Sequence, residues 1–294
     1  MSSPTAVQHP SYTAMGHGRH DYEPCYFFDE LAGSFGYHCH DFYELYIHFS
    51  GADNYCVDNN VYPLQPNQLM IIPPFCLHGF IGDVHFHNYE RAYVYVSSRV
   101  LQNAGCGQID LPRLFGSYTD KGQYQFIMLE EDAAICKRLV QEMVAGLHDD
   151  TPMGRYANQV RLMSYLHILC QTVSRAQKKV EPIAVNDAMQ EVLVYINDHF
   201  TQPQQLSDLA RRFGMSVSLL SHEFVRFTGR SVYDYVLYRR VQLAKELITS
   251  GMQLNDVAYQ CGFNDYSNFL RAFRRISDMS PSAYRKLSQS LAQQ

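Results

Sequence analysis

The N-terminal part of the chain holds side chains that could bind a metal ion or a polar ligand. His38, His40 and Glu44 are separated by even numbers of residues, so on a β-strand they project from one face. His78, from a neighbouring strand, would complete three imidazoles and one carboxylate, a set that suits a divalent transition metal. We favour a second role, as polar walls of a small-molecule pocket, and structural hydrogen bonding between strands is a third.

Arg91, Tyr93 and Tyr95 also alternate along the chain and should share a face. Aromatic faces combined with Arg, His and Glu suit a polyhydroxylated or anionic ligand. A buried guanidinium needs a partner, which a ligand would supply for Arg91. The alternative is that the tyrosines merely fill the interior of a barrel. The predicted ligand-binding residues are therefore His38, His40, Glu44, His78, Arg91 and Tyr93.

A short pattern occurs twice near the C-terminus. Residues 206–216 (LSDLARRFGMS) recur as residues 254–264 (LNDVAYQCGFN) at an offset of 48, and after one extra residue the match resumes at 49. In each copy the Leu/Val and Ala positions form one face of a short helix. Gly214 and Gly262 stand where a sharp turn is needed, because glycine adopts positive φ without steric cost. A polar N-cap and a second amphipathic helix follow, so each copy is a predicted helix-turn-helix.

One such copy would fit a plain helical hairpin about equally well. Two copies joined by a continuous helix, predicted over residues 232–249, favour DNA binding. That spacing could place two recognition helices in successive major-groove faces, roughly one DNA turn apart.

Residues 262–275 (GFNDYSNFLRAFRR) and 280–285 (SPSAYR) resemble the signature of the AraC/XylS family of transcription regulators. Asp278 departs from the family, which usually has Gly after this recognition helix, whereas the first unit keeps Gly229. Asp tolerates the left-handed region less well than Gly, so slight strain is expected there.

The resemblance implies base contacts from both recognition helices. Arg can donate two hydrogen bonds to guanine and Asn can pair with adenine, so the second helix should discriminate more sharply than the first. Arg226, Arg239, Arg240, Arg274 and Arg275 are phosphate candidates, with a solvated surface as the alternative. The predicted DNA-binding residues are Ser218, Ser221, His222, Arg226, Tyr266, Ser267, Asn268, Arg271 and Arg274.

For the N-terminal part, the resemblance implies a cupin-like sensor barrel. The His-x-His and Glu spacing is similar to the metal motifs of cupins, but Phe75 replaces an expected glycine and no Asn follows His78 at the usual distance. We therefore predict no cofactor, with a divalent transition metal as the alternative. Arg91 and Tyr93 are placed like residues on the effector-binding strand of the family's sugar sensors. The apolar stripe Ile135, Leu139, Met143 and Leu147 resembles the family's dimerisation helix, although it could simply pack on its own barrel.

The pattern along the chain supports this division. Short Tyr-, Phe-, Val- and Ile-rich runs broken by turn residues predict strands from about residue 26 to 98, and helical periodicity begins near residue 130. The fold class is α+β, with an antiparallel β-barrel followed by an all-α domain. The predicted parts are an arm (1–22), the barrel (23–128), a helical dimerisation segment (129–178), a linker (179–186) and the DNA-binding domain (187–290).

Charge and cysteine usage agree with an intracellular regulator. Up to residue 186 there are 12 Lys/Arg against 19 Asp/Glu, a net −7, and from residue 187 there are 12 against 10, a net +2, which together give −5. Only the second part is thus electrostatically suited to nucleic acid. No segment resembles a signal peptide or a membrane span, and the eight cysteines form no CxxC pair, so cytoplasmic location and reduced thiols are expected.

We predict a ligand-responsive, sequence-specific DNA-binding regulator, an activator rather than an enzyme, that senses a small molecule such as a sugar. Its expected partners are double-stranded DNA, the effector, RNA polymerase and a second copy of the chain. Two alternatives remain open: a cupin metalloenzyme of isomerase or dioxygenase type with a DNA-binding tail, and a constitutive DNA-binding protein whose barrel only dimerises.

Overall fold

A computed structural model of the chain describes residues 22–32, 38, 40, 42–58, 60–74, 76–80, 86–176, 188–228, 230–277 and 279–292. The predicted arm up to residue 21 and the predicted linker 179–186 lie outside these residues, as do Phe75, Gly229 and Asp278.

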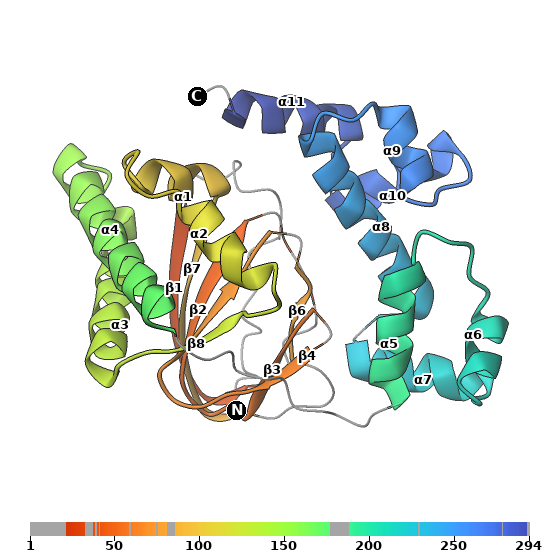
Figure 1. Cartoon of the computed structure of the whole chain (residues 1–294), viewed down its shortest axis with the longest axis horizontal. Helices are drawn as coiled ribbons and strands as arrows, with labels where there is room; N and C mark the ends of the chain where they lie inside the picture. The colour runs from red at the N-terminus through yellow and green to blue at the C-terminus, as the bar shows by residue number, and fades with distance from the viewer. Residues whose placement is uncertain are drawn as a thin grey trace, which may run out of the picture.

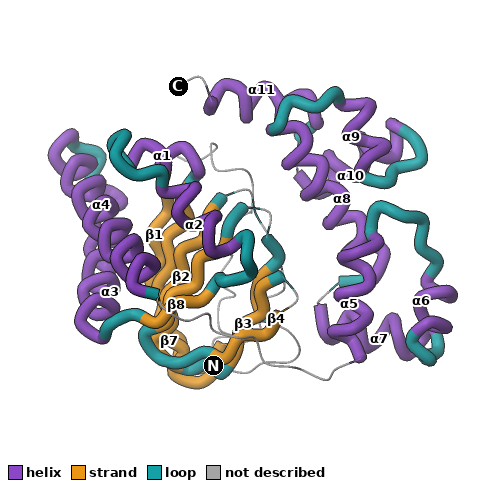
Figure 2. Tube along the Cα trace, viewed as in Figure 1, coloured by secondary structure: helices purple, strands orange, loops and turns teal. Residues whose placement is uncertain are grey.

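The N-terminal half is a two-sheet antiparallel barrel, as predicted (Figures 1 and 2). In the described residues the larger sheet has the order β1-β7-β2-β5-β8 and the smaller one β4-β3-β6. The strand bounds are β1 Tyr22–Ala32, β2 Tyr43–Ser50, β3 Asn54–Val57, β4 Asn60–Pro63, β5 Gln68–Ile72, β6 His78–Gly79, β7 Phe86–Val96 and β8 Gln125–Ile127.

Strand β2 separates two environments because successive side chains point to opposite faces. Leu45 and Ile47 point toward helices on the outside of the larger sheet, whereas Tyr46 points into the space between the two sheets. The inner space is strongly aromatic. It is filled by Phe42, Tyr46, Tyr55, Tyr62, Phe80, Phe86, Tyr89, Tyr93, Tyr95 and Tyr124 together with several aliphatic side chains.

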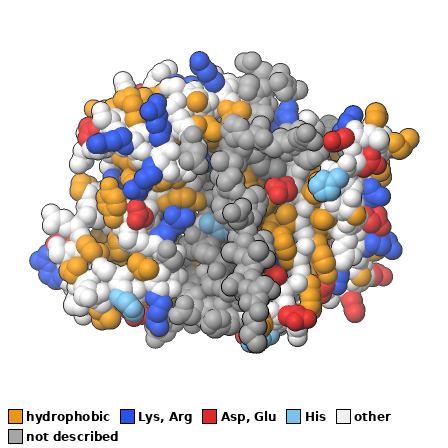
Figure 3. Space-filling view, turned by 180° about the vertical axis from the view of Figure 1, so that it is seen from behind, with side chains coloured by type: hydrophobic (Ala, Val, Ile, Leu, Met, Phe, Trp, Pro, Cys, Tyr) orange, Lys and Arg blue, Asp and Glu red, His pale blue; other side chains and the backbone are white. Residues whose placement is uncertain are grey.

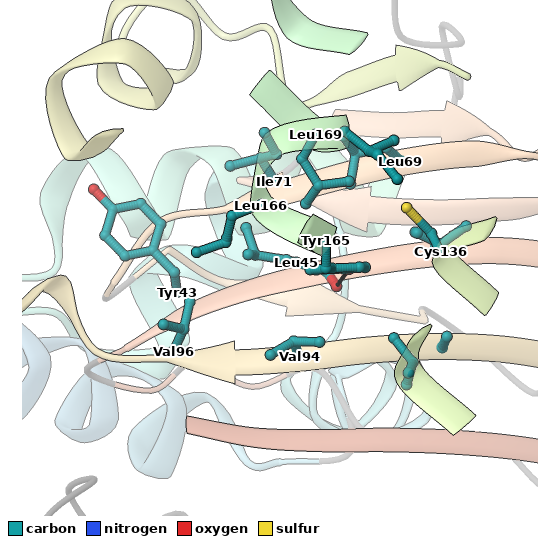
Figure 4. Close-up of a cluster of buried hydrophobic side chains, with 14 of the residues drawn as sticks. Tyr43, Leu45, Leu69, Ile71, Val94, Val96, Cys136, Tyr165, Leu166 and Leu169 are labelled. Carbon is teal, nitrogen blue, oxygen red and sulfur yellow. Dashed lines mark hydrogen bonds between the residues drawn. The ribbon is translucent and has the colours of Figure 1, made fainter. Parts of the chain in front are cut away.

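A pair of helices covers the outer face of the larger sheet. α3 (Glu130–Ala145) and α4 (Pro152–Arg175) lie beside each other, joined through the 3₁₀ turn η1 (Gly146–His148). Cys136 from α3 and Tyr165 from α4 reach the apolar layer of the sheet (Figure 4). The buried Tyr165 hydroxyl donates a 2.9 Å hydrogen bond to the carbonyl of Leu45, so its polar atom is satisfied within the core.

Two short helices within the predicted barrel segment were not predicted. They are α1 (Ser98–Ala104) and α2 (Leu111–Thr119), and Leu101 and Phe115 from them join the outer apolar layer. Both start with a side-chain cap, Ser97 accepting from Val100 N–H and Asp110 from Arg113 N–H. They are too short for helical periodicity to stand out in the sequence.

The C-terminal half contains only helices in its described residues (Figure 2). Their bounds are α5 Ala188–His199, α6 Leu206–Arg212, α7 Val217–Thr228, α8 Val232–Thr249, α9 Leu254–Gln260, α10 Tyr266–Ser277 and α11 Pro281–Ala292. The predicted repeat is therefore α6–α7 and α9–α10, and the predicted connecting helix is α8.

The caps show where the second copy carries its extra residue. Ser216 caps α7 by accepting from Leu219 N–H at 3.1 Å, whereas Asp265 caps α10 by accepting from Asn268 N–H at 2.7 Å. Gly214 and Gly262 precede these caps at φ +64° and +81°. The offset therefore changes from 48 to 49 between Gly262 and Asp265, within the turn, and both pairs of helices keep the same lengths.

The smaller sheet shares a buried apolar cluster with the C-terminal half. Cys56, Val61 and Leu77 belong to the same cluster as Val192 and Ile196 of α5. These three side chains alternate with inward-facing neighbours, so this sheet is also two-sided. In the part of the chain that the structure describes, no helix is both long and apolar enough to cross a membrane.

The two turn glycines should respond differently to substitution. At Gly214 a Cβ would meet no atom within 4 Å, so Gly214→Ala should cost only the left-handed penalty of about 1–2 kcal/mol. At Gly262 the Cβ would overlap the backbone carbonyl of Thr201, so Gly262→Ala should destabilise the protein clearly more. Thermal and urea unfolding of the two variants measure this, and equal losses would contradict the packing described at Gly262.

Candidate functional site

The four predicted metal or pocket residues meet between the two sheets. His38 pairs with His78 through both backbone hydrogen bonds, at 2.9 and 2.8 Å, while Glu44 projects from β2 of the larger sheet. Nε2 of His40 and Nε2 of His78 each lie 3.1 Å from Oε2 of Glu44. One donor atom from each of the four residues lies within 4.8 Å of the others.

The surroundings fix the orientation of two rings in this His38–His40–Glu44–His78 cluster. Nδ1 of His40 donates to the carbonyl of Phe42 at 2.9 Å, and Nδ1 of His78 donates to the carbonyl of Cys76 at 2.8 Å. Burial by itself would raise the pKa of Glu44, but the charge of His78 and the hydrogen bonds of both rings outweigh it and lower that pKa, so the group is a carboxylate.

Aromatic rings enclose this cluster. The ring of Phe42 stacks on His40 with centroids 3.9 Å apart, and Tyr95 packs edge-on against His40 at 5.3 Å. Tyr55 lies over His78 at 6.4 Å. The rings of His40 and His78 are completely buried, so a ligand held here would be largely removed from water.

Arg91 and Tyr93 lie farther along β7 on the same interior face. The Arg91 guanidinium donates to Asp29 at 2.5 Å and lies over the rings of Tyr89 and Phe27, at 4.3 and 4.9 Å. Asp29 on β1 is thus the partner that sequence reasoning left to a ligand. It could have been suspected only from the β1–β7 register, which the sequence does not give.

Tyr95 connects the His38–His40–Glu44–His78 cluster with Arg91 and Tyr93. Its ring lies 4.8 Å from that of Tyr93 and 5.3 Å from that of His40, so all six predicted ligand-binding residues line the same interior. The hydroxyl of Tyr93 is hydrogen-bonded to the thiol of Cys25, and burial raises the pKa of both groups.

Sequence reasoning missed three further polar side chains in this interior, His48, Tyr46 and Tyr89. His48 pairs with Arg91 across β2 and β7, and burial lowers its pKa to about 4, so the ring is neutral. The hydroxyls of Tyr46 and Tyr89 are 2.9 Å apart. The even-number spacing from Glu44 to Tyr46 and His48, and from Arg91 back to Tyr89, was the signal that could have found them.

The predicted base-reading side chains lie on the outward surfaces of α7 and α10. Phe224 and Phe273 on the opposite faces are fully buried, which fixes the rotation of each helix. The exposed members of the predicted set are Ser218, His222, Arg226, Ser267, Asn268, Arg271 and Arg274, and Ser221 and Tyr266 are partly buried.

On α10 the polar side chains form a connected row. Asp265 binds Asn268 through both the backbone and the side chain, and the Oδ1 of Asn268 accepts from Arg271 at 2.5 Å. These residues are three apart and share one side of the helix. The row holds Asn268 and Arg271 in defined positions before any DNA arrives.

On α7 the corresponding positions are weaker donors. Glu223 lies between His222, at 3.1 Å, and Arg226, at 2.5 Å, and the hydrogen bond from His222 lowers the pKa of this carboxyl. The hydroxyl of Ser221 donates to the carbonyl of Val217 on its own helix. A carboxylate on this surface also opposes a phosphate backbone, whereas α10 has none after its cap.

Three of the phosphate candidates are engaged inside the domain. Arg240 donates to the carbonyls of Phe200 and Gln202, at 2.7 and 3.0 Å, and so holds the α5–α6 loop. Arg239 lies over the ring of Phe200, and Arg275 pairs with Asp234 at 2.8 Å. These three arginines therefore already stabilise the domain through contacts with its own residues.

A hollow of about 790 Å³ lies between the two helix-turn-helix units. Its walls include Ser221, Asn268 and Arg271, so predicted base-reading residues of both units line it. Seen from behind, basic side chains predominate over acidic ones on the helical half, which lies on the left in Figure 3.

Comparison with known proteins finds a matching family model for each half of the chain. The model of an AraC-like ligand binding domain matches residues 25–164, and that of a helix-turn-helix domain matches residues 209–287. The HTH-type transcriptional activator RhaS of Citrobacter koseri is 27% identical over 271 residues, covering 88% of this chain and 91% of RhaS. The Klebsiella pneumoniae RhaS is 25% identical, covering 86% of this chain and 88% of that protein.

Some solved structures are similar to the C-terminal part of the chain and others to most of it. The DNA-binding domain of AdpA, a global transcriptional factor solved with a target DNA, is 29% identical over 37% of this chain and 99% of its own, with a TM-score of 0.36. ToxT of Vibrio cholerae is 13% identical over 91% of this chain and 98% of its own, with a TM-score of 0.40. From the ligand-binding and helix-turn-helix matches, the chain belongs to the AraC family of DNA-binding transcriptional regulators.

Proposed function

We propose that this regulator activates transcription when a small polyhydroxylated or anionic molecule, such as a sugar, binds inside the barrel. The observation that carries the proposal is the continuous interior surface of the six residues His38, His40, Glu44, His78, Arg91 and Tyr93. It combines charged and hydrogen-bonding groups with flat aromatic rings, the composition expected of a pocket for such a ligand.

The activator role rests on relatives. Transcriptional activators named RhaS cover most of this chain, and an activator must reach both its operator and RNA polymerase. We therefore propose double-stranded DNA and RNA polymerase as partners, and the cytoplasm as the location. A barrel that only dimerises remains the competing function, and it predicts no response to any small molecule.

We propose domain limits that correspond to these roles. We assign residues 23–128 to effector sensing, 129–178 to subunit pairing and 187–290 to DNA binding, with 1–22 as an arm and 179–186 as a linker. Base reading is assigned to Ser218, Ser221, His222, Tyr266, Ser267, Asn268 and Arg271, and phosphate binding to Arg226 and Arg274.

We propose that the pairing surface lies on α4 rather than on α3. On α3 Cys136, Val140 and Met143 are buried against the chain's own barrel. On α4, by contrast, Met153, Tyr156 and Val160 are 73%, 63% and 47% exposed and are spaced three and four residues apart. Such a helical stripe of apolar residues is suited to a second copy of the chain.

Removing the guanidinium of Arg271 should relax sequence readout at one position. Arg271→Ala should cost about 1–3 kcal/mol of DNA binding on the operator and little on DNA altered at that base pair. Arg274→Ala is the matched control, expected to weaken all sequences alike and reduce the salt dependence. Fluorescence anisotropy on an operator panel measures both, and a uniform loss for Arg271→Ala would make it a phosphate contact.

A true effector should stabilise the protein against heat and change its affinity for DNA. At a hundred times its Kd a ligand adds about 2.7 kcal/mol to the stability. Tyr93→Phe removes only the pocket hydroxyl and should reduce the thermal shift, whereas Tyr124→Phe in the same aromatic cluster should not. Differential scanning fluorimetry with sugars and small acids provides the test, and the dimerisation-only function predicts no shift with any of them.

Charge placed on α4 should break the dimer. Tyr156→Glu puts a carboxylate into the middle of the exposed stripe, so the dimer should dissociate while the unfolding temperature stays near that of the parent protein. Light scattering after gel filtration measures the mass. Ile135→Glu on α3 is the comparison, and a dimer disrupted only by that change would assign pairing to α3 instead.

A further inference from the structure

The His38–His40–Glu44–His78 cluster gathers three imidazoles around one buried carboxylate, close enough together to share a single ion. Backbone carbonyls can only accept, so the Nδ1 atoms of His40 and His78 that face them must carry the ring protons. Both Nε2 atoms then face Oε2 of Glu44, 3.1 Å away. The negative carboxylate between the two ring nitrogens is compensated either by protons on the rings or by a cation that all of them share.

The spacing fits one metal ion as that positive group. Two ligands at about 2.1 Å from a common ion lie about 3.0 Å apart at a right angle and about 3.4 Å apart at the tetrahedral angle. The two 3.1 Å separations fall within that range, and all four donor atoms lie within 4.8 Å of one another. The set thus needs only a small contraction to surround an ion.

The second shell is also that of a metal site. Metal-binding imidazoles usually give their other N–H to a carbonyl or carboxylate, which fixes the ring and the tautomer. His40 and His78 both do so, and the aromatic rings of Phe42, Tyr55 and Tyr95 restrict water around them. His48, on the same strand as Glu44 and equally buried, is not part of the cluster.

We propose that His38, His40, Glu44 and His78 bind one divalent first-row transition metal ion between the two sheets of the sensor barrel. Three imidazole nitrogens and one carboxylate oxygen suit ions from Mn²⁺ to Zn²⁺ in preference to Mg²⁺ or Ca²⁺. The ion ties β2 of the larger sheet to β6 of the smaller one. An ion that prefers five or six ligands keeps open positions for oxygen atoms of an effector, a part of the inference that rests on the proposed function.

Cobalt(II) is the probe, because its visible absorption reports the ligand field. Full-length protein stripped with a chelator should bind about one equivalent of Co²⁺, give a visible band, and lose that band when Zn²⁺ is added. Glu44→Gln and His78→Gln should each weaken Co²⁺ binding at least about tenfold. His48→Gln is the matched control and should titrate like the parent protein.

Two further readouts keep the test decisive. Far-UV circular dichroism shows whether each variant is folded, and His38→Gln, at the less buried edge of the cluster, replaces any variant that is not. Zn²⁺ should raise the unfolding temperature of the parent protein and of His48→Gln, but not of the ligand variants. Neither assay contains DNA or effector, so failure here leaves the regulatory function untouched.

The proposal is overturned if the parent protein takes up no stoichiometric Co²⁺ or Zn²⁺. It is also overturned if all three ligand variants bind the ions as tightly as the parent protein. The first result would mean that protons on the rings, rather than a metal, compensate Glu44, and the second would place the ion elsewhere.

Discussion

The larger sheet of the barrel must bury an apolar layer under the helices on one face and hold a polar, aromatic interior on the other. The N-terminal half is organised around that constraint. Side chains alternate along β2 and β7, so every second residue packs under α3 and α4 while its neighbours enter the space between the sheets. A slip of one residue would exchange the two sets and bury the carboxylate of Glu44 under the helices. The apolar layer that anchors the helices therefore also keeps the polar interior in register.

In the C-terminal half α8 has the equivalent role. It packs against helices of both helix-turn-helix units, and its length fixes how far apart α7 and α10 lie. Gly262 adds a direct contact between the second unit and the α5–α6 loop, where only hydrogen fits against Thr201. Helices α7 and α10 are thus positioned by the same scaffold but carry different side chains, a connected Asp265–Asn268–Arg271 row on α10 and a Glu223-centred group on α7.

Much of this could be predicted because it depends on local periodicity. The bounds of α8, the common face of His40 and Glu44 and the common face of Arg91 and Tyr93 follow from spacing alone, and the repeat located both turns. Features that depend on register or on long-range pairing could not be derived. The partner of Arg91, Asp29, becomes visible only when β1 lies beside β7, and the pairing of His38 with His78 requires the smaller sheet. Helices α1 and α2 are defined by caps and tertiary packing rather than by an amphipathic period.

The two-sided smaller sheet has a consequence for how the barrel interior can influence the DNA-binding half. Leu77 lies in the buried cluster shared with α5, and the next residue, His78, lies against Glu44 inside the barrel. One peptide unit therefore separates the chemistry of the interior from the apolar contact with the DNA-binding half. A displacement of β6 would therefore reach α5 through Leu77, without passing through α3 or α4, which cover the outer face of the larger sheet.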